Sequence, residues 1–291
     1  MSDVLPEGFE DDSISPSSKK PEREGLPPGY RMRADAHYVE LLSSKRDRSE
    51  ARGSKRDREA MESDTDVRDR RSDREHVERL IAQLSEDMSA IEASATLLAG
   101  GAPAVARRVN LDIIRAHAWR AAWVLRAQAL VDGGARVQPR PKQLASLLGH
   151  VRSGFAPEGR LNSISLHVQA SDWNAVVPVD EAAFVAGLTG AIVATVGLIG
   201  PADSATIAVT VTASPGELRT VDITQDDVSI SGPIASRFFD SSWTERQGGW
   251  TAALGAATAR AAAEYHGGDA ALVASPRNGS TIRLSFRPHT T

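Results

Sequence analysis

The feature that most constrains the fold of this chain is a heptad pattern of apolar residues in its first half. Apolar side chains recur at alternating intervals of four and three residues over three repeats, at Val77, Ile81, Leu84, Met88, Ile91, Ala95 and Leu98. A narrow stripe with this period is typical of a helix whose seam packs against a partner helix. The segment Ala99–Pro103 holds two glycines and a proline, and it predicts the end of that helix.

A second helix is predicted from about residue 103 to residue 131. Its apolar face consists of Leu111, Ile114, Ala118, Ala121 and Leu125. Two long antiparallel helices with narrow seams bury little surface by themselves, so we expect residues 76–131 to dimerise into a four-helix bundle. The predicted dimerisation domain is the helical hairpin formed by residues 76–134.

The residues before this hairpin have a different composition. Residues 1 to about 30 are rich in Ser, Pro, Gly, Glu and Lys, and they are predicted to be disordered. The short segment Met32–Leu42 is either a docking peptide with one or two amphipathic helical turns or a locally helical tail. In residues 43–75 the basic and acidic side chains nearly balance, which predicts a solvated helix or a flexible linker. We therefore expect residues 1–75 to be an arm that is disordered or helical and charged.

Residues 138–291 predict one sheet with helices on one face. Alternating strand patterns occupy residues 163–168, 205–213, 218–224, 270–275 and 281–286, and helical patterns occupy residues 141–151, 181–196 and 250–266. Ser214–Gly216 is a hairpin signal between two of the strands. The expected fold class is therefore α+β, a long antiparallel helical hairpin followed by an α/β sandwich.

Composition argues against several classes of function. A net charge of −4 argues against nucleic-acid binding. The chain has no cysteine, and its 7 histidines lack the spacing of metal ligands, so neither a disulfide nor a metal site is predicted. The apolar stretch 182–199 is interrupted by glycines and is weaker than a membrane span requires. No secretory signal opens the chain, and we expect a cytoplasmic protein with no membrane or nucleic-acid partner.

The order of segments near the end of the chain resembles a known family. A Gly-rich segment at Gly248–Gly249 is followed by an alanine-rich helix that ends at Gly267–Gly268, and then by two strands joined around Asn278–Gly279. Together with the helical hairpin, this order resembles the dimerisation and ATP-binding domains of bacterial sensor histidine kinases. The resemblance covers roughly residues 76–288, and it implies a histidine-kinase-like ATPase fold for residues 138–291.

The resemblance is weak where the family has its phospho-accepting histidine. That position falls on Ala82 here, and the acidic residue that should follow it falls on Gln83. The nearest histidine is His76, which is either a phospho-acceptor candidate or an exposed histidine at the start of a helix. His117 lies among apolar residues of the second helix and is expected to be packed or partly buried. No catalytic residue other than the candidate His76 is predicted.

The resemblance is also weak at the nucleotide-binding positions. The helix that should supply Mg²⁺-binding Asn side chains has Gly190 and Ala194 instead, which offer no side-chain oxygen. The family next has an Asp that contacts the adenine, followed by Gly-x-Gly, but Thr224 stands at that position here and residues 223–229 contain no glycine. Asp226 or Asp227 could replace the missing Asp only after a shift in register. Gly249 and Gly255 retain part of the phosphate loop. The nucleotide site near Asp226, Gly249 and Gly255 is therefore predicted to be degenerate, and no cofactor is expected.

Three functions remain open from the sequence. The first is a catalytically inactive dimeric scaffold in two-component signalling that binds a response-regulator receiver domain or a true sensor kinase. The second is a divergent kinase that uses His76 and a rearranged nucleotide site. The third is a histidine phosphotransferase that passes a phosphoryl group through His76 without binding ATP.

Overall fold

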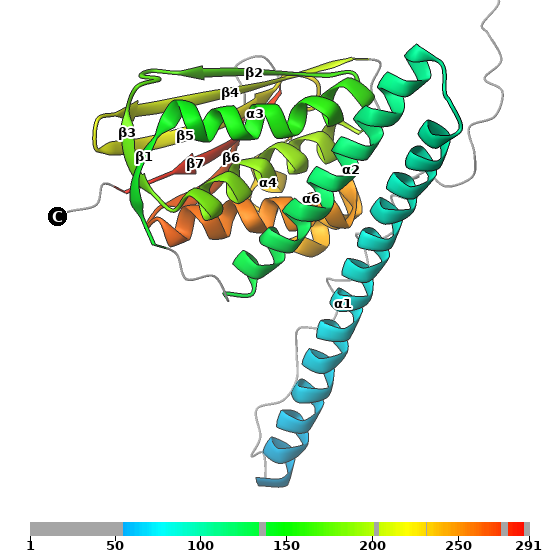
Figure 1. Ribbon diagram of the computed structural model, residues 1–291. Helices are drawn as coiled ribbons and strands as arrows, with labels where there is room; N and C mark the ends of the chain where they lie inside the picture. The colour runs from blue at the N-terminus through cyan, green and yellow to red at the C-terminus, as the bar shows by residue number, and fades with distance from the viewer. Residues whose placement is uncertain (1–54, 134–137, 201–203, 231, 275–278, 288–291) are drawn as a thin grey trace, which may run out of the picture. The chain divides into compact units, whose positions relative to one another are not determined.

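The helical hairpin of the computed structural model is longer than its apolar pattern. The structure describes residues 55–133, 138–200, 204–230, 232–274 and 279–287. Its first two helices are α1 (Lys55–Ala99) and α2 (Ala104–Val131) (Figure 1). Helix α1 begins well before the first seam residue, Val77, so the charged segment from residue 55 is helical and not a flexible linker. The predicted disordered start, the segment Met32–Leu42 and the predicted domain boundary at 134–137 lie outside the described residues.

Helices α1 and α2 run antiparallel, as two polar contacts between them show. His76 on α1 meets Gln128 on α2, whereas Asp87, further along α1, meets His117, which lies earlier on α2. The turn between the helices contains Gly101 with a φ of 82°, a left-handed conformation that favours glycine. The end of α1 at Ala99, which was predicted from the glycines and proline of Ala99–Pro103, is confirmed. Helix α2 ends at Val131, as predicted.

A five-stranded mixed sheet forms the second part of the described chain. Its strand order is β2-β4-β5-β7-β6, with β2 parallel to β4 and the other neighbours antiparallel. The strands are β2 (Ile164–Ala170), β4 (Ala205–Ser214), β5 (Glu217–Gln225), β6 (Asp269–Ala274) and β7 (Ser280–Ser285). All five were predicted from alternating patterns. The hairpin between β4 and β5 turns at Gly216, as its sequence indicated.

A second, two-stranded sheet was not predicted. Strands β1 (Arg140–Gln143) and β3 (Val176–Val179) pair antiparallel. The helix predicted over residues 141–151 is therefore wrong at its start, because residues 140–143 are held in the β1–β3 pair. Helix α3 follows at Leu144 and continues to Leu161, well past the predicted end at residue 151.

Helices α3, α4 and α6 cover one face of the five-stranded sheet (Figure 1). Helix α4 spans Glu181–Ile199, α6 spans Ser241–Tyr265, and the short α5 spans Gly232–Ala235. In the part of the chain that the structure describes, α4 is the one helix long and apolar enough to cross a membrane, and 61% of its apolar window is buried inside the fold. Its inward side chains Phe184, Leu188 and Ile192 are buried in the main core. The predicted sandwich of one sheet and one helical layer is confirmed.

The C-terminal end of α6 is closed by the two glycines that the sequence indicated. The N–H of Gly267 donates to the carbonyl of Glu264, and the N–H of Gly268 donates to the carbonyl of Ala263. This pair of bonds is a Schellman motif, and Gly267 has the left-handed φ of 73° that the motif requires. These glycines therefore have a structural role that does not depend on a nucleotide.

Candidate functional site

Helices α4 and α6 are in direct backbone contact at the positions where nucleotide ligands were sought. A Cβ atom added to Gly255 would lie 2.5 Å from the carbonyl oxygen of Gly190, and one added to Gly190 would lie 2.6 Å from the carbonyl oxygen of Gly255. Ala194 is fully buried in the same contact. The residues expected to flank a nucleotide thus contact one another, and no space remains between them.

The Gly-rich segment is reduced to a one-residue kink. Gly249 has a φ of 82° and a ψ of 173°, and the chain is helical on both sides of it. Gly248 packs against Gly197 of α4, where an added Cβ would lie 2.9 Å from the carbonyl carbon. The Gly-rich segment is therefore a kink between two helices and not an extended loop.

The turn after β5, where an adenine-reading Asp was expected, is closed by the side chain of Gln225. This side chain is buried, and its Oε1 accepts hydrogen bonds from the N–H groups of Asp227 (2.6 Å) and Val228 (2.7 Å). Its Nε2 donates to the carbonyl of Val228 (2.5 Å) and to Oγ of Ser280 (2.6 Å). The adjacent Asp226 is exposed. No local pattern in the sequence points to Gln225, because its role depends on Ser280, which is distant along the chain.

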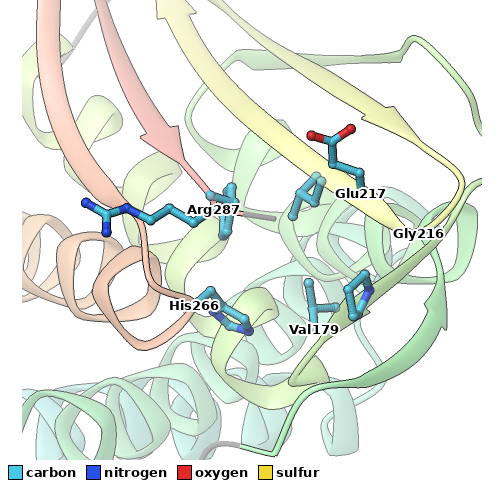
Figure 2. Close-up of a pocket in the computed structure, with 8 residues that line it drawn as sticks. Val179, Gly216, Glu217, His266 and Arg287 are labelled. Carbon is cyan, nitrogen blue, oxygen red and sulfur yellow. The ribbon is translucent and has the colours of Figure 1, made fainter. Parts of the chain in front are cut away.

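A small cavity lies elsewhere in the fold. It is lined in part by Val179, Glu217, His266 and Arg287 (Figure 2), and its volume is about 10 Å³. This is room for about one water molecule. Asp226, Gly249 and Gly255, the residues of the predicted nucleotide site, do not line this cavity.

His266 in that cavity is committed to structural hydrogen bonds. Its Nδ1 lies 2.7 Å from the carbonyl of Ala262, and its Nε2 accepts from the N–H of Asp180 at 3.0 Å. The imidazole is therefore neutral, with the proton on Nδ1, and it fastens the end of α6 to the start of α4.

A larger but shallow groove of about 300 Å³ lies between the ends of α2 and α6. It is lined by Leu130, Val131, Ala261, Glu264 and Tyr265. This lining includes a carboxylate and no cationic side chain, which disfavours a phosphate-bearing ligand. Neither cavity fits Mg²⁺-ATP, and the described residues contain no group of three side chains that could hold a metal ion.

One interpretation of the sequence made His76 an exposed histidine, and the structure differs from it. It is half-buried, its Nε2 lies 2.5 Å from Oε1 of Gln128, and its ring centroid lies 5.9 Å from that of Trp250 on α6. The reason is that α6 packs on the hairpin, which the sequence could not indicate. Ala82, at the position of the family's phospho-acceptor, is an exposed methyl group.

A partly buried polar cluster joins α1, α2 and α3, and we name it the α1–α2–α3 junction. It consists of Asp87, His117, Arg120, Glu158 and Asn162. Nδ1 of His117 lies 2.7 Å from Oδ1 of Asp87, and Arg120 lies 3.6 Å from the same oxygen and 2.5 Å from Oε1 of Glu158. Asn162 donates to Glu158 at 3.0 Å. The prediction that His117 is partly buried is confirmed, since 18% of its side chain is exposed.

Asp87 is the residue at this junction that the sequence interpretation missed. It is fully buried, and the sequence analysis did not single it out. A signal was present, because Leu80, Leu84, Asp87 and Ile91 follow the same spacing of four and three residues as the seam. That spacing places a carboxylate on the inner face of α1.

Beside the junction, a bidentate ion pair connects α2 to α3. The guanidinium of Arg160 donates to both carboxylate oxygens of Asp112, at 2.8 and 2.6 Å. These hydrogen bonds hold the pKa of the Asp112 carboxyl below its ordinary value, against the opposing effect of burial. The same pairing raises the pKa of Arg160.

No family model matches this chain, and no curated protein matches it. Solved structures that are similar include the catalytic domain of the histidine kinase ThkA, at 16% identity and a TM-score of 0.44, covering 52% of this chain and 96% of that one. The histidine kinase AdeS of Acinetobacter baumannii matches at 10% identity and a TM-score of 0.44, covering 71% and 98%. A bacterial phosphotransferase matches at 15% identity and a TM-score of 0.42, covering 70% and 91%. At these values the matches assign no residue a role.

Proposed function

We propose that this protein is a histidine-kinase-like homodimer in two-component signalling that does not use ATP and that binds a receiver domain or a true sensor kinase. The observation that carries the proposal is the direct contact between Gly190 and Gly255. The chain has the segment order of the kinase family, with a helix cap at Gly267–Gly268 and a closing hairpin of β6 and β7. The positions that would surround a nucleotide are filled by its own backbone.

The proposed dimer surface is an apolar stripe along the hairpin, which we name the outer seam. On α1 it contains Val77, Ile81 and Met88, whose exposed fractions are 51%, 58% and 51%, and on α2 it contains Leu111 and Leu125. These side chains are unpaired in one copy, because α1 and α2 contact each other through a different face. A second copy would cover them in the manner of a four-helix bundle.

The proposed partners follow from the resemblance stated above, because the helical bundle of sensor kinases is the surface on which receiver domains dock. Titration of the full chain with purified receiver domains and sensor kinases from the same cell tests this part. We expect saturable binding to at least one of them. If no member of a complete panel binds, the proposed partner is refuted and the proposed dimer is not.

The absence of nucleotide chemistry is tested by titrating the protein with a fluorescent ATP analogue in the presence of Mg²⁺. We expect no saturable binding at micromolar concentrations, because the α4–α6 contact leaves no volume for the phosphates. Binding with a micromolar Kd would contradict the proposal and favour the alternative of a divergent kinase that uses His76.

The dimer is tested with Ile81→Glu, which places a charge in the outer seam. The matched control is Ala93→Glu, since Ala93 is exposed on α1 but lies outside the seam. By light scattering we expect twice the chain mass of 31.0 kDa for the wild type and the control, and the single-chain mass for Ile81→Glu. A wild-type protein that is monomeric at micromolar concentration would refute the dimer.

A second candidate function is phosphoryl transfer without ATP. It was considered from the sequence with His76 as the acceptor, but the Nε2 of His76 is already engaged by Gln128. That contact disfavours His76 as an acceptor, and we therefore prefer the scaffold over this alternative.

A further inference from the structure

We infer that the outer edge of strand β2 pairs with the same edge of a second copy, so that two five-stranded sheets join into one. This inference goes beyond the proposed function, because β2 lies outside the outer seam and the hairpin dimer does not require it. It is carried by the direction of the backbone groups along β2 and by the side chains beside them.

Strand β2 forms one edge of the five-stranded sheet (Figure 1). In the part of the chain that the structure describes, β4 is the one strand that pairs with it. An edge strand presents a row of N–H and C=O groups, and many proteins block such a row with charged side chains, a proline or a bulge. The sequence of β2 contains no Asp, Glu, Lys, Arg or Pro, and its register with β4 is uninterrupted. Strand β2 therefore has none of these blocks.

Two backbone hydrogen bonds at the ends of β2 show which of its residues face outward. The N–H of Ala205 on β4 donates to the carbonyl of Ser163, and the N–H of Ser171 donates to the carbonyl of Val211 on β4. Along a strand, alternate residues direct both backbone groups to the same side, so the odd-numbered residues from 163 to 171 face β4. The residues that direct both groups to the outer edge are Ile164, Leu166, Val168 and Ala170.

Helix α3 covers the outer edge at the first of these residues. A Cβ atom added to Gly159 of α3 would lie 2.6 Å from the carbonyl oxygen of Ile164, which leaves no room for a partner strand at that carbonyl. Further along, Leu166, Val168 and Ala170 are each partly exposed. We name these three residues the β2 edge, and Val168 is its centre.

A second copy fits the β2 edge in one register. A two-fold axis at Val168 places Leu166 opposite Ala170 of the second copy and Val168 opposite its own equivalent. In an antiparallel ladder, residues that direct their backbone groups at each other exchange two hydrogen bonds, so this register uses every group of both edges. The resulting interface is isologous, as in most soluble homodimers.

The side chains also match in this register. Leu166, Val168 and Ala170 pack against the main core but are covered incompletely, and a second copy would place the same apolar side chains beside them. On the opposite face of the sheet, the exposed His167 lies opposite Gln169 of the second copy, and an imidazole and an amide are hydrogen-bonding partners. No like charges meet, because residues 163–171 contain no Asp, Glu, Lys or Arg. The β2 edge is thus complementary to itself, which favours a second copy as its occupant.

The pairing at the β2 edge is weak and separable from the hairpin dimer. One strand pair is smaller than a standard protein interface, so we expect a dissociation constant on the order of 100 µM. At the micromolar concentrations that test the hairpin dimer, the β2 edge is therefore mostly unpaired. Ile81→Glu breaks the outer seam and should leave the β2 pairing intact, so that one interface can fail without the other.

Amide hydrogen exchange of the full chain shows what occupies the β2 edge. We expect its N–H groups to become protected as the protein concentration is raised through the dissociation constant. The N–H groups of Ser165, His167 and Gln169 face β4 and should be protected at every concentration. Protection of the β2 edge that does not depend on concentration would overturn the inference, because the edge would then be covered within one chain. Fast exchange of the edge at the highest concentration would also overturn it.

Disulfide trapping tests the register, and the chain has no cysteine of its own. His167 and Gln169 of the second copy form a non-hydrogen-bonded pair with Cα atoms about 4.5 Å apart, within the range of a disulfide. A mixture of His167→Cys and Gln169→Cys should therefore cross-link under mild oxidation. Either variant alone brings two Cα atoms only to about 8 Å and should not cross-link. Ser165→Cys is the matched control on the same face, and cross-linking of this control as fast as the mixture would refute the register.

Charge variants test the pairing without disturbing the core, since His167 and Gln169 are exposed. His167→Lys/Gln169→Lys places like charges opposite each other across the two-fold axis and should weaken association about tenfold. The matched variant His167→Glu/Gln169→Lys places opposite charges in the same pairs and should associate at least as tightly as the unmodified edge. Sedimentation equilibrium in the Ile81→Glu background measures both dissociation constants. Equal values for the two double variants would refute the pairing.

Discussion

The α4–α6 contact and the α1–α2–α3 junction differ in what they bury. The α4–α6 contact buries glycine and alanine, with Gly190 and Gly255 touching through their backbones. The junction buries two carboxylates, one guanidinium and most of an imidazole. The first region is packed like an ordinary core, whereas the second retains ionic groups that packing alone does not favour.

The two regions therefore owe their structure to different interactions. Between α4 and α6, Gly249 is a kink between helices, Gln225 closes its own turn, and Gly255 allows two helices to touch. At the junction, charged side chains surround the His117 imidazole, of which 18% is exposed. Close packing accounts for the first region, and pairing of polar groups accounts for the second.

The largest expected effect comes from filling the α4–α6 contact. Gly255→Leu forces α4 and α6 apart, because even the first added carbon would lie 2.5 Å from a carbonyl oxygen, and we expect a loss of about 3 kcal/mol in the free energy of unfolding. The matched control is Gly149→Leu on α3, where an added Cβ meets nothing within 4 Å. The control should gain about 0.5 to 1 kcal/mol from helix propensity.

Urea unfolding of both variants measures the difference. A Gly255→Leu protein as stable as the wild type would show that the contact is loose. In that case the region could open for a ligand, and the contrast between the two regions would fail.

A smaller effect is expected at the turn after β5. Gln225→Ala leaves buried partners of the lost amide unsatisfied, including Oγ of Ser280 and the N–H of Val228, and it should cost about 2 kcal/mol. Thermal and urea unfolding check this value. If Gln225→Ala is neutral but creates a site for adenine nucleotides, the turn is a blocked ligand site and not a structural element.

The sequence predicted the elements that have local signals. The hairpin of β4 and β5 was predicted because alternating residues flank Gly216, and α4 because residues 181–196 have an apolar helical pattern. Strands β1 and β3 were not, because each has four residues and their pairing joins positions such as Arg140 and Val179. Such short segments carry too few alternations to be distinguished from a loop or a helix start.

The candidate site was predictable only in part. The absence of side-chain oxygens at Gly190 and Ala194 follows from residue identity alone. The meeting of Asp87 with His117 requires the register between two antiparallel helices, whose inner residues pack together with Leu254 of α6. Residue types show which side-chain groups are present, but only the three-dimensional arrangement shows which of them meet.

The smallest expected effect tests whether charges near the junction serve stability. Asp112→Asn removes the ionic part of the bidentate pair with Arg160 and should cost about 1 kcal/mol at pH 7, because Arg160 is largely exposed. The folded-state pKa of Asp112 lies below its unfolded value of about 3.9, so this contribution is present above that pH and is lost as the pH falls through the folded pKa. The gap between wild type and variant in urea unfolding should therefore be constant from pH 7 to about pH 5 and shrink below about pH 4. Asp132→Asn at the exposed end of α2 should change little at any pH, and a gap at Asp112 that widens in acid would contradict the assigned direction.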